Sequence, residues 1–321
     1  MARTRYATDR GLIARMGATM FLLGLVFTAF IIVVVVLLTR YSSVGNGGII
    51  FIAILFGLVA SFGSYYWSDK IALRTAGARL VTPEQAPELH GIIDRLCALA
   101  DMPKPKVAIA PTDLPNAFAT GRSSKVAVLC VTQGLLNRLE PNELEGVLAH
   151  EMSHVAHKDV AVMTIASFLG IVAALMVRFA FYSELFGGGG RGRGGRGGNN
   201  NQNALPVVLI VMLVGMVVYA ISFLLIRLLS RYRELSADRS GALLTGQPSA
   251  LASALVKVSG EMARIPTRDL RAAEPLNAFF FAPALATKGG QVSLSAIFST
   301  HPPLEKRLRE LDKISQQLSR Q

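Results

Sequence analysis

The chain has 321 residues, enough for one or two domains, and only two cysteines. A disulfide framework is therefore not indicated, which agrees with a reducing cytoplasmic side. Hydrophobic residues make up 51% of the chain and its mean hydropathy is +0.43, above the average of soluble proteins. The formal net charge of +12 is compatible with nucleic-acid binding, but the basic residues are not gathered on a recognisable binding module, and we predict no nucleic-acid partner. Several flank hydrophobic runs instead, as expected from the positive-inside rule and contact with anionic lipid.

Four long runs contain no charged residue: 16–39, 41–68, 160–177 and 197–226. Each holds an apolar core near or above the ~18–20 residues that span a hydrocarbon layer of about 30 Å. The first run is too long for a signal-peptide core and is followed closely by another run. We therefore predict a polytopic membrane protein with four hydrophobic helices.

The first two runs are expected to form a transmembrane hairpin over residues 1–69, with the uncharged turn 42–48 as its outer loop. The N- and C-termini and the hydrophilic segments 70–159 and 231–321 would then lie on the cytoplasmic side of the plasma or inner membrane. The last two runs form a second hydrophobic hairpin, 160–230, interrupted by a flexible Gly/Arg-rich linker at 187–196. The arginines of this linker disagree with a full crossing, so partial crossing of this pair is the alternative.

Residues 70–159 and 231–321 are more hydrophilic and are expected to form the two parts of one domain outside the hydrophobic spans. In the first part, residues 82–85 resemble a capping box that opens a helix. Two β-rich runs follow at 106–110 and 125–131. The expected fold class is mostly α with a small β-sheet, in a polytopic membrane protein with four hydrophobic helices.

The last segment of the chain has a helical stripe of apolar residues. The stripe consists of Leu304, Leu308, Leu311, Ile314 and Leu318. Arg307 is predicted to lie on the charged face of this helix, opposite the apolar stripe. A C-terminal helix packed on the domain outside the spans is the simplest interpretation.

The motif that indicates a chemistry is His150-Glu151-Met152-Ser153-His154. On a helix, the two imidazoles project from one face one turn apart, where both bind a single zinc ion. Glu151 would stand beside the water to be activated. Pro141 suits the first position of this helix and Glu143 its first turn. The alternative is a surface helix with incidental histidines.

A catalytic zinc needs a third protein ligand. His157 shares the face of His154, but two helical turns, about 10 Å, separate it from His150. The pattern of the metzincins requires a further histidine at position 160, which is a valine. Neither provides the third ligand.

Glu234 fits this role better. It lies about eight residues beyond the last uncharged run, and a hairpin would return it to the surface near His154. Asp238, at i+4 on the same helical face, would accept the other ring N–H of a ligand histidine, with His150 the favoured partner. The alternative for both acids is an ordinary exposed helix of mixed charge.

Together these residues resemble the HtpX-type membrane-bound zinc metalloproteases, a heat-shock protease family related to the CAAX prenyl proteases. The resemblance runs through nearly the whole chain in matching order. It rests on the two leading spans, Asn116-Ala117-Phe118-Ala119-Thr120-Gly121, the His150–His154 motif, Asp159, Glu234 with Asp238, and Thr300-His301-Pro302-Pro303.

The resemblance implies a gluzincin-like HExxH catalytic domain formed by residues 70–159, with the HExxH helix, and 231–321, with the third zinc ligand. It implies one Zn²⁺ per chain held by His150, His154 and Glu234, with Glu151 as the general base toward a zinc-activated water. It implies that His301 stabilises the oxyanion of the tetrahedral intermediate, the alternative being a helix-start residue. It also implies that the segment beginning with Asn116 and Ala117 binds an extended substrate as an added strand. A plain turn is the alternative for Asn116.

The function expected from the resemblance is a membrane-embedded endopeptidase that cleaves misfolded or damaged membrane proteins at the cytoplasmic face, within protein quality control and the stress response. Its partners would be polypeptide substrates and the lipid bilayer, and no oligomeric state is predicted. One alternative is a prenyl-protein-type protease, although four spans are few to enclose the chamber of that branch. The other is a non-enzymatic, metal-stabilised membrane scaffold.

Overall fold

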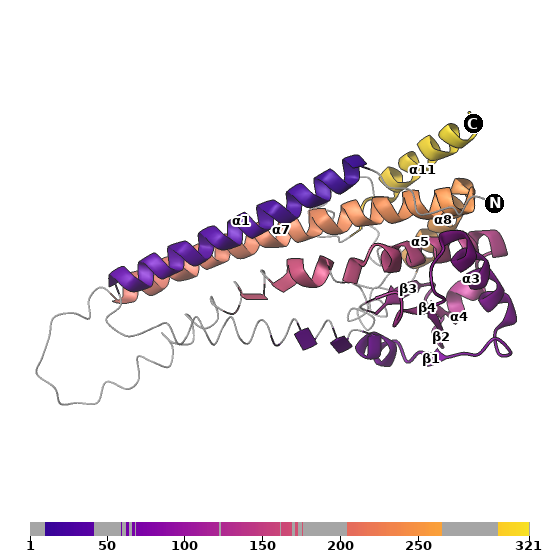
Figure 1. Cartoon of the computed structure of the whole chain (residues 1–321), viewed down its shortest axis with the longest axis horizontal. Helices are drawn as coiled ribbons and strands as arrows, with labels where there is room; N and C mark the ends of the chain where they lie inside the picture. The colour runs from indigo at the N-terminus through magenta and orange to yellow at the C-terminus, as the bar shows by residue number, and fades with distance from the viewer. Residues whose placement is uncertain are drawn as a thin grey trace, which may run out of the picture. The chain divides into compact units, whose positions relative to one another are not determined.

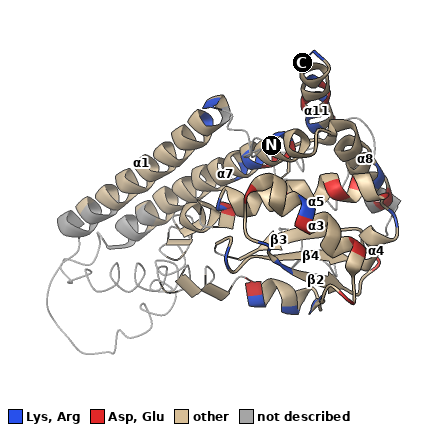
Figure 2. Ribbon diagram, turned by 45° about the vertical axis from the view of Figure 1, so that its right-hand side comes forward, with Lys and Arg blue, Asp and Glu red and all other residues tan. Residues whose placement is uncertain are grey.

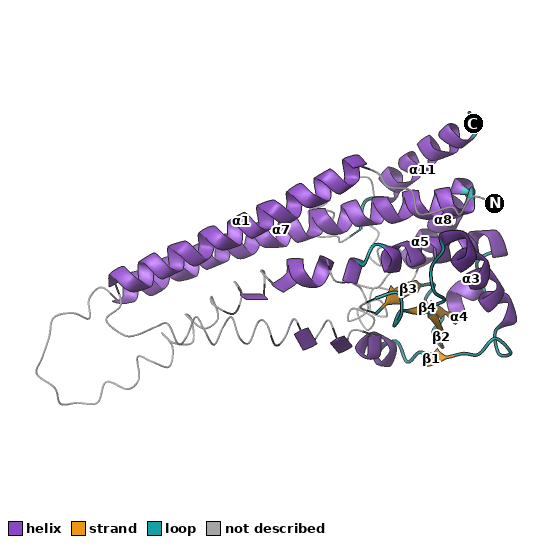
Figure 3. Cartoon of the chain, viewed as in Figure 1, coloured by secondary structure: helices purple, strands orange, loops and turns teal. Residues whose placement is uncertain are grey.

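The computed structural model describes residues 10–41, 59–175 with short gaps at 60–61, 64–65, 68, 122, 161, 169–170 and 173–174, then 204–264 and 301–320. The chain divides into two compact units. One comprises Met1–Met16, Tyr65–Val162 and Arg227–Gln321, and the other Gly17–Ser64 and Met163–Ile226. Figures 1 and 3 show that the described strands all lie in the first unit, together with several helices.

A four-stranded mixed sheet forms the centre of the first unit, in the order β1-β2-β4-β3. The strands are β1 (Arg79–Leu80), β2 (Lys106–Ala110), β3 (Ala117–Thr120) and β4 (Val128–Thr132). The predicted strand at 106–110 is confirmed, and the predicted run at 125–131 is confirmed as β4 with a later start. Parallel pairing of β2 with β4 and antiparallel pairing of β3 with β4 leave β1 and β3 as the two edges.

Side chains alternate between the two faces of this sheet, as the pleat requires. One face contributes Val107, Leu129 and Val131 to the main core, which includes residues of α3 (Pro87–Ala100), α5 (Pro141–Ala156) and α8 (Pro248–Arg264). The other face has a smaller core of its own. It consists of Ala72, Ala108, Ala110, Phe118, Val128 and Cys130. The sheet is thus buried on both faces.

The predicted start of the first soluble helix is wrong. Helix α3 begins at Pro87 with Ala86 as its N-cap, whereas residues 83–85 form a turn. The residue before a proline is disfavoured in the helical region, so Pro87 fixes the first helical position and prevents an earlier start. Half of the expected capping contact still exists, since the Thr82 N–H donates to Gln85 Oε1 at 3.0 Å.

Arg307 also differs from its prediction. It lies on α11 (Leu304–Leu318) but on the buried side, with 1% of its surface exposed. The physical reason is a carboxylate, Asp238, that accepts two hydrogen bonds from the Arg307 guanidinium. A buried arginine is tolerated when it is paired in this way.

Two described helices are long and apolar enough to cross a membrane. The first candidate span, Ile13–Val33, lies in α1 (Arg10–Tyr41), and the second, Met212–Thr245, lies in α7 (Ala204–Thr245). Their apolar side chains are largely exposed, for example Phe21 at 73% and Leu213 at 59%, as lipid contact requires. Figure 2 shows no charged residue along most of the drawn length of α1. Of the other two predicted spans, 41–68 lies largely outside the described residues, and 160–177 is described in part, with residues 162–168 helical.

Candidate active site

Helix α5 carries the histidine motif. Pro141 is its first residue and Glu143 lies in its first turn, as predicted. The N-cap Glu140 also forms a reciprocal capping box with Glu143, which was not predicted. These features fix where the helix begins, because proline at this point needs no N–H partner and the capping box satisfies backbone donors. The helix then buries His150 and Glu151 almost completely.

His150 and His154 point toward one another from adjacent turns of α5. Their Nε2 atoms lie 3.3 Å apart, and the two rings are nearly perpendicular, at 86°. Burial lowers the pKa of His150, which favours the neutral ring that a metal ion requires.

Glu234 of α7 meets this imidazole pair from a helix distant in sequence. Its carboxylate oxygens lie 3.8 Å from His150 Nε2 and 3.5 Å from His154 Nε2. One ligand atom from each of these residues lies within 4.8 Å of the others. Ligand atoms held at ~2.0–2.2 Å around one tetrahedral zinc ion would be about 3.3–3.6 Å apart. The donor atoms and their spacing fit this ion.

Each imidazole contacts a carboxylate through its other nitrogen. His150 Nδ1 lies 2.9 Å from Asp238 Oδ1, and His154 Nδ1 lies 2.5 Å from Asp159 Oδ2. Such contacts place the proton on Nδ1 and leave Nε2 to face an ion. The partner of His150 corresponds to the prediction made for Asp238, whereas the partner of His154 was not foreseen from the residues alone.

Two arginines complete this arrangement, and sequence reasoning missed both. Arg307 donates to Asp238 through Nε at 2.7 Å and through a terminal nitrogen at 2.6 Å. Arg233 pairs with the carboxylate of Asp159 and donates to its main-chain oxygen at 2.7 Å. A signal for Arg307 existed, because it stands three residues after Leu304 and four before Leu311, within the apolar stripe.

Glu151 is held between α5 and the edge strand β3. The main-chain N–H of Ala119 donates to Glu151 Oε2 at 3.1 Å. Burial raises the pKa of the Glu151 carboxyl from its usual 4.5 to about 7. A carboxyl group that exchanges its proton near neutral pH has the property that a general base requires.

The strand β3 presents alternate main-chain groups to its two sides. Asn116 uses its main chain toward β4, since its N–H donates to Thr132 Oγ1 at 2.8 Å and its carbonyl accepts from the Thr132 N–H at 2.9 Å. The main-chain groups of Ala117 and Ala119 therefore face outward, on the side of Glu151. Any substrate contact of Asn116 must use its side chain.

His301 lies beside the same cluster. Its Nδ1 is 2.9 Å from Glu234 Oε2, and the residue is buried. His157, by contrast, ends α5 as its C-cap and lies outside the group of possible metal ligands. Burial lowers the pKa of His157.

A glycine allows α7 to approach α5 closely at the site. A Cβ atom on Gly241 would lie 2.9 Å from the backbone nitrogen of His150 and 3.1 Å from its Cα. Real side chains do not approach a backbone this closely, so only glycine fits at this crossing. The crossing brings Glu234 and Asp238 to the imidazole pair.

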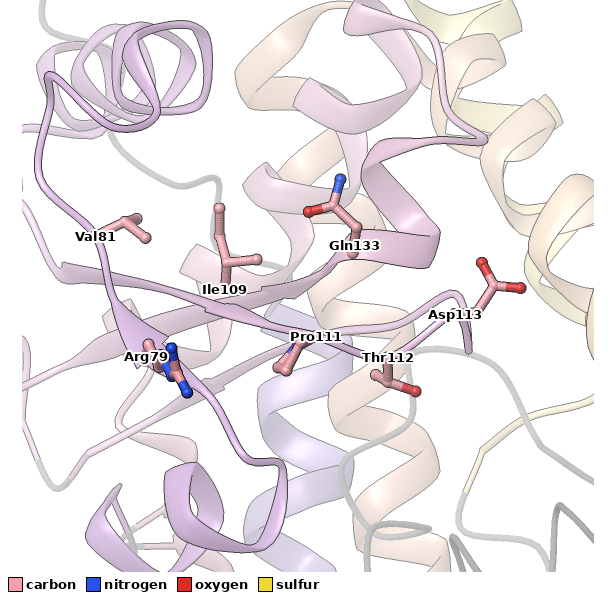
Figure 4. A pocket seen from close by; sticks show the side chains of 7 residues that line it. All are labelled: Arg79, Val81, Ile109, Pro111, Thr112, Asp113 and Gln133. Atoms are coloured by element: carbon pink, nitrogen blue, oxygen red, sulfur yellow. The ribbon is translucent and has the colours of Figure 1, made fainter.

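A pocket of about 530 Å³ lies elsewhere, on the β1 side of the sheet. Figure 4 shows the labelled side chains of Val81 and Ile109 beside the more polar Arg79, Thr112 and Gln133. It contains none of the candidate catalytic or metal-binding residues.

Known proteins resemble this chain along most of its length. Residues 83–315 match the description Peptidase family M48. The chain is 55% identical over 316 residues to "Protease HtpX homolog 1" of Streptomyces coelicolor, covering 98% of this chain and 97% of that protein. It is 49% identical over 317 residues to "Protease HtpX homolog 2" of Methanosarcina mazei, covering 99% and 100%. The crystal structure of S. mikatae Ste24p aligns with a TM-score of 0.49 at 16% identity, covering 97% of this chain and 68% of that one. The chain thus belongs to Peptidase family M48 and is a membrane metalloprotease.

Proposed function

We propose that the protein is a zinc-dependent endopeptidase in which His150, His154 and Glu234 bind one Zn²⁺ ion. The observation that carries the proposal is the convergence of two Nε2 atoms and one carboxylate at separations of 3.3, 3.5 and 3.8 Å. Both imidazoles are oriented from behind by carboxylates, as expected for metal-ligating histidines.

A zinc ion in this position supplies a Lewis acid that activates water and polarises a peptide carbonyl. Glu151 would accept the proton of the attacking water and deliver it to the leaving amine. The near-neutral pKa of Glu151 supports both steps. The N–H of Ala119 holds Glu151 Oε2, which leaves the proton transfer to the other carboxylate oxygen.

Substrate is proposed to bind as an extended strand along the outer edge of β3. The outward main-chain groups of Ala117 and the carbonyl of Ala119 support this, because an added strand pairs with such groups, whereas the Ala119 N–H already donates to Glu151. The same strand holds Glu151, so a scissile bond aligned on β3 would lie beside the base. The Asn116 side chain and the His301 imidazole are proposed as further contacts, the latter to the oxyanion.

The physiological substrates are proposed to be misfolded or damaged membrane proteins, cleaved at the cytoplasmic face in the course of protein quality control and the stress response. The printed names of the relatives support proteolysis, and the two candidate spans support membrane insertion. The multi-pass topology with four helices, cytoplasmic termini and the division at residues 69, 159 and 230 belongs to the same proposal.

The test uses the full-length protein in detergent with an unfolded polypeptide as substrate. We expect Glu151→Gln to retain zinc while cleavage falls about 100-fold or more, and a chelator to abolish cleavage. The exposed Glu305 on α11 provides a control, since Glu305→Gln should leave cleavage unchanged. Zinc binding without cleavage in any form would refute the endopeptidase and favour a metal-stabilised scaffold.

The ligand assignment has a separate test, zinc content after dialysis. Glu234→Ala should lose zinc, whereas His157→Ala should keep it, because His157 lies outside the ligand group. The opposite pattern would refute the assignment of the third ligand.

A further inference from the structure

Residues 69–78 connect the second uncharged run, 41–68, to strand β1, and residues 69–75 of this connection are helical. Ala72 is fully buried against the sheet, and Leu73, Ala76 and Ala78 pack on the same core. This short helix, drawn next to β1 in Figure 1, is therefore fixed to the sheet by one of its faces.

The opposite face has a different composition. In the sequence, Trp67, Lys70, Ile71 and Arg74 follow the spacing i, i+3, i+4, i+7, which is the spacing of residues on one side of a helix. We call these four residues the juxtamembrane face. Trp67 is 59% exposed and Ile71 is 54% exposed, and Lys70 and Arg74 are exposed beside them.

This combination is poorly suited to water. A solvent-facing helix surface is normally polar, whereas this face places an indole and a branched aliphatic side chain between two cations. Tryptophan with flanking Lys and Arg is typical of the boundary between lipid tails and headgroups, where the ring is partly buried and the cations reach outward.

The charges on this face lack local compensation. Residues 65–80 contain Lys70, Arg74 and Arg79 but only one acid, Asp69. Within the described part of the chain, neither Lys70 nor Arg74 forms an ion pair. Both cations are therefore available to an external anion.

The position of the juxtamembrane face in the sequence indicates which kind of anion Lys70 and Arg74 would bind. Trp67 is the penultimate residue of the uncharged run 41–68, and Lys70 follows two residues after that run ends. A chain that leaves a hydrocarbon layer at this point passes directly through the headgroup region. We propose that the juxtamembrane face binds anionic phospholipid, with Trp67 and Ile71 at the acyl boundary and Lys70 and Arg74 against phosphate headgroups.

The test uses the intrinsic fluorescence of Trp67, which is the single tryptophan of the chain. The full-length protein is reconstituted into vesicles of phosphatidylcholine with a minor fraction of phosphatidylglycerol. In one preparation the phosphatidylglycerol carries brominated acyl chains, and in the other an equal amount of the phosphatidylcholine does. Bromine quenches tryptophan on contact, so the ratio of the two quenching values reports which lipid adjoins Trp67 at constant surface charge.

We expect the anionic brominated lipid to quench at least about twofold more strongly, because each cation near the surface attracts anionic lipid. This preference should decrease at high salt, which screens exposed charges. It should disappear in the double variant Lys70→Gln/Arg74→Gln. The double variant Lys306→Gln/Arg309→Gln removes the same charge from exposed positions of α11 and should keep the preference.

Equal quenching by both lipids in the wild-type protein would overturn the proposal, since Trp67 would then contact lipid without selecting anionic headgroups. Absence of quenching by either lipid would also overturn it, because the face would then contact water or another protein. Neither outcome depends on peptidase activity, so the inference fails or stands separately from the proposed function.

Discussion

Replacement of Arg307 by methionine is expected to destabilise the protein severely. Arg307 and Asp238 are each 1% exposed and share two short hydrogen bonds. Removing one member of a buried ion pair leaves the other charge uncompensated, which costs about 3–5 kcal/mol. At about 2–4 °C per kcal/mol for a unit of this size, the Tm should fall by on the order of 10 °C.

The assay is thermal unfolding of the detergent-solubilised protein after treatment with a chelator, together with a zinc titration. Without Arg307, Asp238 is no longer held in a fixed position and orients His150 less well. Zinc binding should therefore also weaken by about 10–100-fold. Arg309→Met is the matched control on the same helix, since Arg309 is exposed and its replacement should change stability by no more than about 0.5 kcal/mol.

The double variant Arg307→Met/Asp238→Asn gives a second criterion. Removing both charges should cost less than the sum of the two single changes, because no buried charge is left unpaired. Equal Tm values for Arg307→Met and Arg309→Met, or strict additivity in the double variant, would refute the reasoning.

Asp159→Asn should weaken zinc binding by about 10–100-fold, measured by competition with a chromogenic chelator, because His154 Nδ1 loses its carboxylate partner; unchanged affinity would contradict this. Gly241→Ala should lower stability by about 1–3 kcal/mol, because the added methyl group would contact the α5 backbone. Gly260→Ala has open space around it and should be neutral or stabilising by up to about 1 kcal/mol. Thermal unfolding compares the two variants. In metal-free protein the pKa of Glu151 is raised from its usual 4.5 to about 7. The folded state therefore gains stability from the protonated Glu151 below pH 4.5, and this contribution is lost as the pH rises through about 7. Glu151→Gln should therefore stabilise the metal-free protein increasingly with pH, and a Tm difference that stays constant with pH would argue against this.

The candidate metal-binding residues could largely be predicted from the sequence, because their relative positions follow from local rules of helix geometry. The i, i+4 spacing of His150 and His154 needs only a helix, and the same spacing relates Glu234 to Asp238. Bringing the two pairs together required one further assumption, a return of the chain, and the structure places the carboxylate 3.5 Å from His154.

The polar groups that contact these residues were harder to predict from the sequence, because their positions depend on tertiary contacts. Arg307 resembles any surface arginine until Asp238 is known to lie opposite it. Ala119 has no side-chain chemistry, and its contact with Glu151 arises from the alternation of an edge strand. Helix α3 starts later than predicted because Pro87, and not the capping pattern that precedes it, determines the first helical position.

Helix α7 runs unbroken from Ala204 to Thr245 and carries the proposed third ligand on the same rod as an uncharged segment that ends at Ile226. The uncharged segment of α7 and Glu234 are thus joined by continuous helix and not by a loop. A cut between them leaves at most residues 227–233, about two turns, before Glu234, and it exposes a frayed helical end close to the proposed metal site. A water-soluble fragment of this protein therefore has to recap the new end of α7, or replace the exposed apolar residues of α7 in place.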